Sequence, residues 1–600
     1  MKKILETLFI LIAGFTFTGC DDLLDVVPKD KMSPDTFFDN ETELKAFSMN
    51  FYGMFPGTGL YIANDDAYTQ LTLSDEMRGG AIRSIPASAS DGGWSWGALR
   101  NVNTMLDYLP QCEDKAVRTH YEALARFFRA YFYFEKLKRF GDVPWYDTQV
   151  GSTDTEQLNR PRDSREFIMG KMIEDIDFAI AKLPSTKSTY EVTRWTAMAL
   201  KSRFLLFEGT FRKYHTEFDY GQGAHDAKWY LDLCAETSAE MMATSGYTLH
   251  TDGGKNGAYY QLFTTFNATE LTDEVILARN YNLTYGVYHN SNYTMNTGSM
   301  GRPGMTKKIV ASYLMADGTR FTDKMGWETM NFYDETKDRD PRLAQAIRTP
   351  GYKRMGTEVF SAPDLACSIT GYQPIKYVTT KDQDVWNGAD IDLIIFRYAE
   401  VLLNYAEAKA EAGSINQEDL DKSVNLLRDR VGMPHLSLSA ANDSPDGFLT
   451  DSEWGGYQNV TGNYAGVILE IRRERTVELC QEGLRYYDIM RWKEGKTFEA
   501  PIYGMYFPGA GEYDLDGDGS KDILLYTTDE APAGTAPLKY KIGTDIVLSG
   551  GNSGFVSPHA TTDRTWNEGR DYLYPIPIDE RSLTRGALKQ NPGWDDGLTF

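Results

Sequence analysis

The feature that most constrains the fold is a series of amphipathic helical segments that recur in pairs. In the clearest segment, "HYEALARFFRAYFYFEKLKRF", Tyr121, Leu124, Phe128 and Phe132 form one apolar stripe at helical spacing. A glycine and a proline follow it, which is the order expected where a helix ends. Comparable segments occupy about residues 163–184, 194–209, 226–243, 396–413, 416–432 and 466–492.

The pairing of these segments indicates a fold class. Antiparallel helix pairs with alanine and aromatic faces are typical of tetratricopeptide-type stacking, although the period here is irregular. Residues 250–395 and 500–570 are richer in Gly, Asn, Thr and Tyr and contain short strand-like runs such as "EVILARN" and "DILLYTT". We therefore predict a mainly α fold in which tetratricopeptide-like helix pairs form a scaffold for a loop-rich, partly β ligand-binding face.

The charge balance restricts the partners. The chain has 62 basic and 86 acidic residues, a formal net charge of -24. Nucleic-acid binding depends on clustered Lys and Arg, and docking on anionic lipid also needs basic patches, so neither is expected. The overall charge favours neutral or cationic ligands.

The cysteines and histidines provide no catalytic or metal-binding motif. None of the five cysteines forms a CxxC pair, and Cys234 and Cys480 lie on apolar helical faces, where we expect buried thiols. The seven histidines are scattered, and neither HExxH nor GxSxG occurs. The sequence therefore predicts no enzyme and no required cofactor.

The N-terminus has the three parts of an export signal. Basic "MKK" precedes an apolar run from Leu8 to Phe17, which is too short to span a bilayer, and "FTGC" follows. The small residue before Cys20 resembles a bacterial lipobox, with Phe17 in place of the usual Leu. We therefore expect a signal peptide over residues 1–19 and acyl chains on Cys20, the only part that enters a membrane. The alternative is a plain signal peptide with an incidental cysteine.

Seven phrases in order resemble the SusD/RagB family of outer-membrane nutrient-binding lipoproteins. They are "LLDVVPKDKMSPDTFFDNETEL", "RFFRAYFYFEKLKRFGDVPW", "DRDPRLAQAI", "IIFRYAEVLLNYAEAKAEAG", "NLLRDRVGMP", "IRRERTVELCQEGLRYYDIMRW" and "YLYPIPIDERSLTRGALKQNPGW". The resemblance covers almost the whole mature chain. It implies a SusD-like N-terminal region with helix pairs over residues 20–250 and a loop-rich C-terminal region with further pairs over residues 251–600.

The resemblance also implies a role without catalysis. The protein would lie in the outer membrane, lipid-anchored and facing the cell exterior, with Asp21 and Asp22 similar to a surface-export signal. There it would capture a glycan and deliver it to a TonB-dependent SusC-like transporter. The alternative within the family is capture of oligopeptides, and a further alternative from another class is a surface glycoside hydrolase.

The first candidate ligand site is "GGWSWGALRN". Sugars are held by aromatic rings against their C–H faces and by planar polar groups at their hydroxyls. Trp94 and Trp96 follow a Gly-rich stretch before a helix, Asn101 follows five residues after Trp96, and Arg78 lies upstream. Because aromatic residues on loops are stronger site candidates than those on periodic faces, we expect these four side chains to bind ligand. The alternative is that Trp96 packs against the helix it precedes.

A second candidate patch lies in "NYNLTYGVYHNSNYTMN". Tyr285, Tyr288 and Tyr293 lie among asparagines without a helical period, and Trp327 follows on another loop. We predict ligand contacts from these four rings as well. A tyrosine in a loop can equally pack against the scaffold.

The stretch "DLDGDGSKD" resembles a calcium-binding loop. Asp514, Asp516, Asp518 and Asp522 match positions 1, 3, 5 and 9 of such a loop, while Leu525 replaces the usual bidentate Glu at position 12. Carboxylates this dense repel one another unless a cation lies among them. We therefore expect a structural calcium ion that orders a surface loop, with a solvated acidic turn as the alternative.

Charged residues in two of the family-like phrases are expected to be structural. Arg339 and Arg342 flank an Asp-Pro pair, where they can tie a loop to carboxylates. Arg475, Glu478 and Arg485 lie in the last helical segment. Because charged helix residues are usually solvated or paired, a scaffold ion network is the better interpretation than a binding site.

Overall fold

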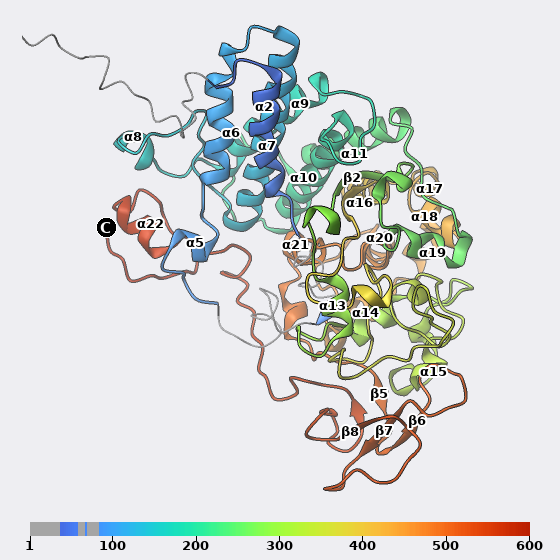
Figure 1. Ribbon diagram of the computed structural model, residues 1–600. Helices are drawn as coiled ribbons and strands as arrows, with labels where there is room; N and C mark the ends of the chain where they lie inside the picture. The colour runs from blue at the N-terminus through green and yellow to red at the C-terminus, as the bar shows by residue number, and fades with distance from the viewer. Residues whose placement is uncertain (1–36, 58–66, 69–82) are drawn as a thin grey trace, which may run out of the picture.

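Paired helices form the frame of the computed structural model, which describes residues 37–57, 67–68 and 83–600 (Figure 1). The described α-helices are α2 (Glu41–Ser48), α5 (Ala89–Gly92), α6 (Gly97–Tyr108), α7 (Lys115–Phe140), α8 (Thr155–Leu158), α9 (Arg165–Lys182), α10 (Arg194–Tyr214), α11 (Ala227–Thr244), α12 (Ala258–Leu262), α13 (Ser291–Asn296), α14 (Lys307–Ser312), α15 (Phe332–Glu335), α16 (Tyr398–Glu411), α17 (Gln417–Asp421), α18 (Val424–Val431), α19 (Leu438–Asp443), α20 (Ala465–Glu478), α21 (Arg485–Arg491) and α22 (Ile578–Leu583). Short 3₁₀ turns connect several of them. The predicted mainly α fold with tetratricopeptide-like pairs is confirmed.

The long helices begin and end where the side chains dictate. Asp114 caps α7 by accepting hydrogen bonds from the first-turn N–H groups of Ala116 and Val117. Gly141 ends the same helix with φ +73°, a conformation that a side chain would strain. Ser164 caps α9 in the same way as Asp114, and a reciprocal Thr193–Thr196 capping box begins α10. Local sequence therefore sets these boundaries.

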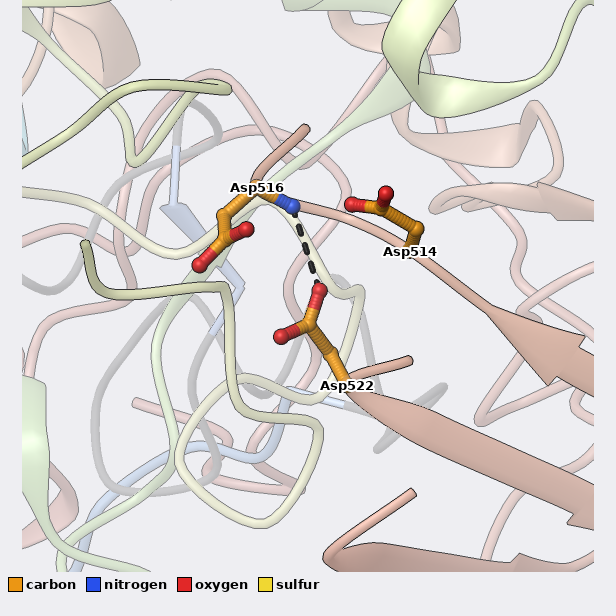
Figure 2. A group of neighbouring side chains, drawn as sticks. All are labelled: Asp514, Asp516 and Asp522. Carbon is orange, nitrogen blue, oxygen red and sulfur yellow. Dashed lines mark hydrogen bonds between the residues drawn. The ribbon is translucent and has the colours of Figure 1, made fainter. Parts of the chain in front are cut away.

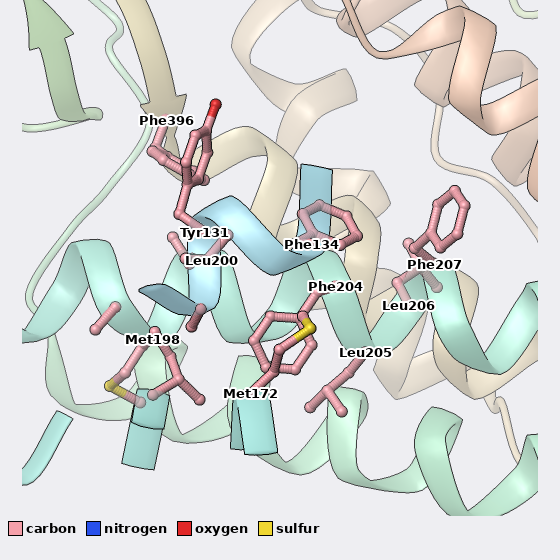
Figure 3. Close-up of a cluster of buried hydrophobic side chains, with 14 of the residues drawn as sticks. Tyr131, Phe134, Met172, Met198, Leu200, Phe204, Leu205, Leu206, Phe207 and Phe396 are labelled. Carbon is pink, nitrogen blue, oxygen red and sulfur yellow. The ribbon is translucent and has the colours of Figure 1, made fainter. Parts of the chain in front are cut away.

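The pairs pack in chain order through one large core. Helix α7 packs on α9, α9 on α10, α10 on α11, and α11 on α16. At Gly209 the backbone of α10 comes so close to α11 that an added Cβ would lie 2.7 Å from the side chain of Leu231. Figure 3 shows the interior of this stack, which contains buried rings from α7, α10 and β4: Tyr131, Phe134, Phe204, Phe207 and Phe396.

Burial of these side chains supplies the main driving force for folding. Each fully buried large apolar side chain contributes about 1.5–3 kcal/mol relative to exposure. Cys234 and Cys480 are fully buried, as predicted from their helical faces. All the thiols in the described part of the chain are free, so packing rather than disulfide bonding holds this region together.

Small sheets join the helical frame to the C-terminal region. The strands are β1 (Ala67–Tyr68), β2 (Val275–Arg279), β3 (Gly304–Met305), β4 (Leu393–Arg397), β5 (Tyr506–Phe507), β6 (Gly511–Tyr513), β7 (Ile523–Tyr526), β8 (Leu538–Lys541) and β9 (Gly554–Phe555). Antiparallel pairs form between β1 and β3, β2 and β4, and β5 and β9. In the fourth sheet, β7 is antiparallel to β6 and parallel to β8, and this sheet lies at one end of the molecule (Figure 1).

A buried ion network ties the last long helix to three other segments. The carboxylate of Glu478 on α20 accepts from Arg397 and Arg430 at 2.6 Å and from Arg342 at 3.0 Å. Burial alone would raise the pKa of Glu478, but the guanidinium groups of Arg430, Arg397 and Arg342 hold it well below its usual range. The predicted structural role is therefore confirmed for Arg342 and Glu478.

The other charged residues predicted to be structural are also held inside the scaffold. Arg475 pairs with Asp488 at 2.7 Å, and Arg485 donates to the Thr476 hydroxyl at 2.8 Å. Arg339 differs from the prediction, because its hydrogen bonds go to backbone carbonyls, including that of Glu335 at 2.7 Å. It therefore ties the loop to main chain rather than to a carboxylate.

Candidate functional site

A cavity of about 500 Å³ lies at the start of α6. Its walls come from α6, the segment 144–152, the residues after α8, and α22, which lie on one side of the molecule (Figure 1). This volume suits a small sugar or a short segment of a longer chain. The side chains that line it are mainly those of Trp94, Trp96, Leu99, Arg100, Asn103, Pro144, Tyr146, Thr148, Leu158, Arg160, Glu580, Thr584 and Leu588.

The two predicted tryptophans have different roles here. Trp94 is only 1% exposed, and its ring packs edge-on against Phe140 and Trp96, with centroids 4.8 and 5.4 Å apart. Trp96 is half-buried at the N-cap position of α6 and meets the ring of Tyr146 edge-on at 5.5 Å. Trp94 therefore supports Trp96 from the core. Trp96 and Tyr146 are the rings that line the cavity with part of their surface uncovered.

The asparagine in the cavity wall is Asn103, not the predicted Asn101. Asn101 is exposed on another face of α6 and does not line the cavity. Trp96, Arg100 and Asn103 are four and three residues apart, so they share one helix face. This spacing was the signal in the sequence that could have identified Asn103.

The amide of Asn103 is held rigidly and has one unused acceptor. Its Nδ2 donates to the carbonyl oxygens of Tyr146 and Thr148 at 2.9 and 3.0 Å. The residue is 1% exposed, and its Oδ1 has no hydrogen-bond partner in the described part of the chain. Because a buried acceptor without a partner is costly, this oxygen is a place where a donor would be stabilised.

The charged groups that line the cavity differ in how they are paired. Arg160 pairs with Asp163 at 3.1 Å and donates to the carbonyl oxygen of Trp145 at 2.6 Å. Arg100 is exposed, donates to the carbonyl oxygen of Val150 at 2.9 Å, and forms no ion pair with any described residue. The one carboxylate among the described lining residues is Glu580, whose pKa is raised by burial and by its neighbour Asp579.

A buried lysine lies behind the aromatic wall. Lys136 on α7 donates to the carbonyl oxygen of Gly93 at 2.6 Å, and its ammonium group lies 5.5 Å from the Trp96 ring centroid. Among the described residues it forms no ion pair. Burial and the nearby Arg139 lower its pKa from 10.5 to about 8. The positive charge behind Trp96 is therefore only partly compensated.

The second predicted patch is separated from this cavity, because α13 and α6 lie in different parts of the molecule (Figure 1). Tyr285 is 82% exposed, and Tyr288 on the same turn is also exposed. Tyr293 packs edge-on against Trp386 at 5.6 Å, and Trp386 is 56% exposed. We call Tyr293 and Trp386 the second platform.

Trp386 was missed by sequence reasoning because it lies 93 residues after Tyr293 in the chain. The two loops are joined by the Asn290–Asn387 side-chain hydrogen bond of 3.1 Å and by the antiparallel bridge between His289 and Ala389. Periodicity cannot reveal this pairing. Its only signal in the sequence is an isolated Trp in the Asp-rich stretch "KDQDVWNGAD".

Trp327 does not belong to either aromatic surface. It is 7% exposed and packs with Phe321, Phe448 and Trp454 in a small core cluster. The prediction that this loop residue presents a free ring is therefore wrong. The loop folds back onto the protein, where Phe448 and Trp454, distant in sequence, pack against the ring together with the nearby Phe321.

The acidic loop brings three of its four predicted ligands together between β6 and β7. Oxygens of Asp514, Asp516 and Asp522 lie within 4.8 Å of one another, whereas Asp518 does not join them (Figure 2). Burial raises the pKa values of Asp516 and Asp522, and repulsion from the neighbouring aspartates adds to the increase. Carboxylate oxygens in this arrangement are the donor set that Ca²⁺ prefers.

Several predictions fall outside the described residues. They are the signal peptide over residues 1–19, the lipidation candidate Cys20, the export-signal residues Asp21 and Asp22, and the ligand candidate Arg78. None of the helices in the described ranges combines the length and hydrophobicity needed to cross a bilayer.

Comparison with known proteins gives consistent matches along the chain. The family model described as "SusD family" matches residues 273–594, and the one described as "starch-binding associating with outer membrane" matches residues 95–206. A curated relative, SusD-like protein P2 of Formosa agariphila, is 25% identical over 88% of this chain and 96% of its own length.

Solved structures show the same fold. A SusD-like carbohydrate binding protein from Bacteroides fragilis aligns with a TM-score of 0.67 at 21% identity, covering 91% of this chain and 99% of that one. A protein solved with a xylogluco-oligosaccharide aligns with a TM-score of 0.56 at 17% identity, covering 94% of this chain and 98% of that one.

Proposed function

This chain belongs to the SusD family, and from that premise we propose that it is a cell-surface glycan-binding lipoprotein. It captures oligo- or polysaccharide and delivers it to a TonB-dependent SusC-like transporter of the outer membrane. The observation that carries the proposal is the cavity in which the half-buried Trp96 meets Tyr146 beside planar polar side chains.

The chemistry of the cavity suits a sugar. The uncovered surfaces of Trp96 and Tyr146 offer apolar contact to C–H groups, and the guanidinium of Arg100 offers donors to hydroxyl oxygens. In the same wall, the buried Oδ1 atom of Asn103 is an acceptor without a partner among the described residues. Trp94 behind Trp96 fixes the ring, which lowers the entropy lost on binding.

The relatives support this choice of ligand class. One structural relative is described as carbohydrate binding, and another was solved with a xylogluco-oligosaccharide. Oligopeptide capture is the alternative, but a peptide site would be richer in groups that bind backbone amides than in aromatic rings. The aromatic wall therefore favours a glycan.

Binding without hydrolysis is part of the proposal. Glycosidases use two carboxyl groups about 5–10 Å apart across the scissile bond. The described lining of this cavity contains one carboxylate, Glu580, so the pair needed for hydrolysis is not assembled from those residues. Glycan binding with no release of reducing sugar is the expected behaviour.

The location is proposed from the N-terminus and the family. The "FTGC" motif supports acylation of Cys20 after removal of residues 1–19, and the description of the second family model supports association with the outer membrane. We place the protein body outside the cell, where a lipid anchor leaves it able to meet both a polysaccharide and its transporter.

The second platform is proposed as an additional glycan contact. Tyr293 and Trp386 present adjacent rings, and Tyr285 and Tyr288 are exposed on a neighbouring turn. A polysaccharide that touches both the cavity and this platform gains effective concentration at the second site. Shortening the glycan should therefore weaken binding more than the loss of contacts at one site explains.

A structural calcium ion is proposed at Asp514, Asp516 and Asp522. Support comes from the convergence of their oxygens and from the mutual repulsion that a cation would relieve. The ion would stiffen the turn between β6 and β7 and has no part in glycan binding.

Affinity gels and calorimetry with the full chain in detergent, against a panel of polysaccharides, test the function. Trp96→Ala should weaken binding of the preferred glycan at least tenfold, which is about 1.4 kcal/mol. Trp229→Ala is the matched control, because Trp229 is a partly exposed tryptophan on α11 away from the cavity. If no glycan binds, or if Trp96→Ala binds as tightly as the wild type, the proposal at this site is wrong.

A further inference from the structure

We propose that the cavity at Trp96 selects a negatively charged sugar residue, one that carries a carboxylate or a sulfate ester. The selecting groups are the guanidinium of Arg100 and the positive end of α6. This inference rests on the proposed glycan-binding function and adds to it the class of sugar.

The charge of the cavity wall differs from that of the whole protein. The chain carries a net charge of -24, which by itself favours neutral or cationic ligands. The described lining of the cavity instead contains two arginines, Arg100 and Arg160, and one carboxylate, Glu580. Salt largely screens charges that lie more than about 10 Å away. The groups in the wall therefore set most of the electrostatic potential at a bound ligand.

Arg100 has guanidinium N–H groups that form no ion pair with any described residue. Its Nη2 donates to the carbonyl oxygen of Val150 at 2.9 Å, and no described carboxylate pairs with it. The other arginine of the described lining, Arg160, is paired with Asp163 at 3.1 Å. An arginine that keeps its fork of N–H groups free at a cavity wall matches the geometry of a carboxylate or sulfate.

The start of α6 also favours an anion at this wall. Its N-cap residue is Trp96, which has no acceptor, and no side chain caps the first turn. The N-terminal end of a helix carries a partial positive charge and unpaired N–H groups, which favours an anion. Gly97 and Leu99 of this turn are part of the cavity wall, so the helix end opens on the ligand space.

An independent sign of a ligand lies at the same helix face. Asn103 lines the cavity and is 1% exposed, and its buried Oδ1 atom has no partner among the described residues. An acceptor next to cationic donors suits a sugar that presents a hydroxyl beside its charged group. The ammonium group of Lys136, 5.5 Å from the Trp96 ring, adds positive potential from behind.

The opposing charges are few and are weakened by their surroundings. Asp163 is engaged by Arg160, and Glu580 is the carboxylate that faces the ligand space, beside Asp579 on α22. Burial and Asp579 raise the pKa of Glu580, so its charged form is less favoured than that of an exposed glutamate. Since Asp163 offsets the charge of Arg160, Arg100 remains as the lining cation without a carboxylate partner among the described residues.

The test uses matched pairs of glycans that differ only in charge. The full chain is titrated by calorimetry with oligogalacturonate and its carboxyl-reduced neutral form, and with a sulfated galactan oligosaccharide and its desulfated form. We expect the anionic member of at least one pair to bind about tenfold tighter, because the guanidinium of Arg100 can donate charge-assisted hydrogen bonds to an anionic oxygen. The two pairs distinguish carboxylate from sulfate.

Two variants connect this selectivity to the cavity. Arg100→Gln should reduce the ratio of anionic to neutral affinity about tenfold. Arg118→Gln is the control, because Arg118 also donates to a backbone carbonyl, that of Cys112, but lies on α7 outside the cavity. It should keep the wild-type ratio.

The outcomes separate this inference from the proposed function. Equal affinity for both members of every pair, or an unchanged ratio in Arg100→Gln, overturns the selection of charged sugars while glycan binding stands. Absence of binding to every glycan overturns both. A ratio that falls in Arg100→Gln and persists in Arg118→Gln supports the inference.

Discussion

Two groups of basic side chains in this protein differ in whether the fold supplies their partners. In the scaffold, Arg342, Arg397 and Arg430 converge on the buried carboxylate of Glu478 at 2.6–3.0 Å. At the cavity, Arg100 donates to one backbone carbonyl and forms no ion pair in the described part of the chain.

The difference teaches how to separate structural from functional charges. Burying an ion is costly, and the cost is offset only when partners and hydrogen bonds surround it, as they do around Glu478. A cation that lies at a cavity wall without a partner adds little to the free energy of folding. We therefore expect its favourable interactions to form when a ligand binds.

Neutralising the centre of the network should have the largest effect. Glu478→Gln leaves three buried guanidinium groups without their shared charge, so we expect the free energy of unfolding to fall by about 3–5 kcal/mol. Urea unfolding at pH 7 measures this. Glu418→Gln, at an exposed position on α17, is the control and should change it by less than about 0.5 kcal/mol.

The same network makes a pH prediction. Because the folded pKa of Glu478 is lowered, its contribution is present above its usual value of 4.5 and is lost as pH falls below it. The stability difference between wild type and Glu478→Gln should therefore shrink in acid. A loss under 1 kcal/mol at pH 7, or a difference that does not depend on pH, would contradict the structural role.

Lys136 provides the next test, because it is a buried cation without an ion pair. Its folded pKa is about 8 and its usual value is 10.5, so between these pH values the unfolded chain binds more protons. Stability of the wild type should therefore rise with pH across this window, relative to Lys136→Met, by up to about 3 kcal/mol.

Thermal unfolding of the two proteins from pH 7 to pH 10.5 measures the change. Lys228→Met is the control, since Lys228 is exposed and pairs with Asp232 on the helix surface. Its difference from the wild type should stay within about 0.5 kcal/mol as pH rises from 7 to 9. A constant gap for Lys136→Met would show that the ammonium group is better compensated than the geometry indicates.

The aspartates between β6 and β7 show the same lack of partners for negative charges instead of positive ones. If calcium binds there, a hundredfold excess over its dissociation constant should stabilise this region by about 2.7 kcal/mol. The melting temperature with calcium, magnesium or chelator measures this, and Asp522→Asn should remove the response. An equal melting temperature in calcium and chelator would leave the loop as a solvated acidic turn.

The smallest expected change in stability is the most informative about the cavity. Arg100→Gln removes one hydrogen bond from an exposed side chain, so its free energy of unfolding should stay within about 0.5 kcal/mol of the wild type. Urea unfolding alongside Arg397→Gln makes the comparison direct, since that residue is fully buried in the network. A loss above 2 kcal/mol in Arg100→Gln would make it a structural residue.

Much of the helical frame could be predicted from the sequence, because capping and periodicity are local. Gly141 ends α7 where the pattern indicates, and the apolar stripe with Tyr121 and Phe128 faces the core. The tryptophan pair before α6 was also found, although only Trp96 faces the cavity with part of its ring uncovered.

The rest of the candidate site depended on contacts that sequence distance conceals. Asn103 replaces Asn101 because helix geometry turns it towards the wall that Tyr146 and Thr148 complete. Trp386 reaches Tyr293 only because two loops pair through asparagines, and Trp327 is covered by rings from residues more than a hundred positions away.

Local order and composition were enough to predict the family, the helix pairs and the residue types available for a ligand. The three-dimensional packing then fixed which rings are uncovered, which asparagine lines the cavity, and which arginines already have partners. Burial and pairing are properties of surroundings assembled from distant segments. The same residue type is therefore a scaffold ion at Arg397 and a candidate ligand contact at Arg100.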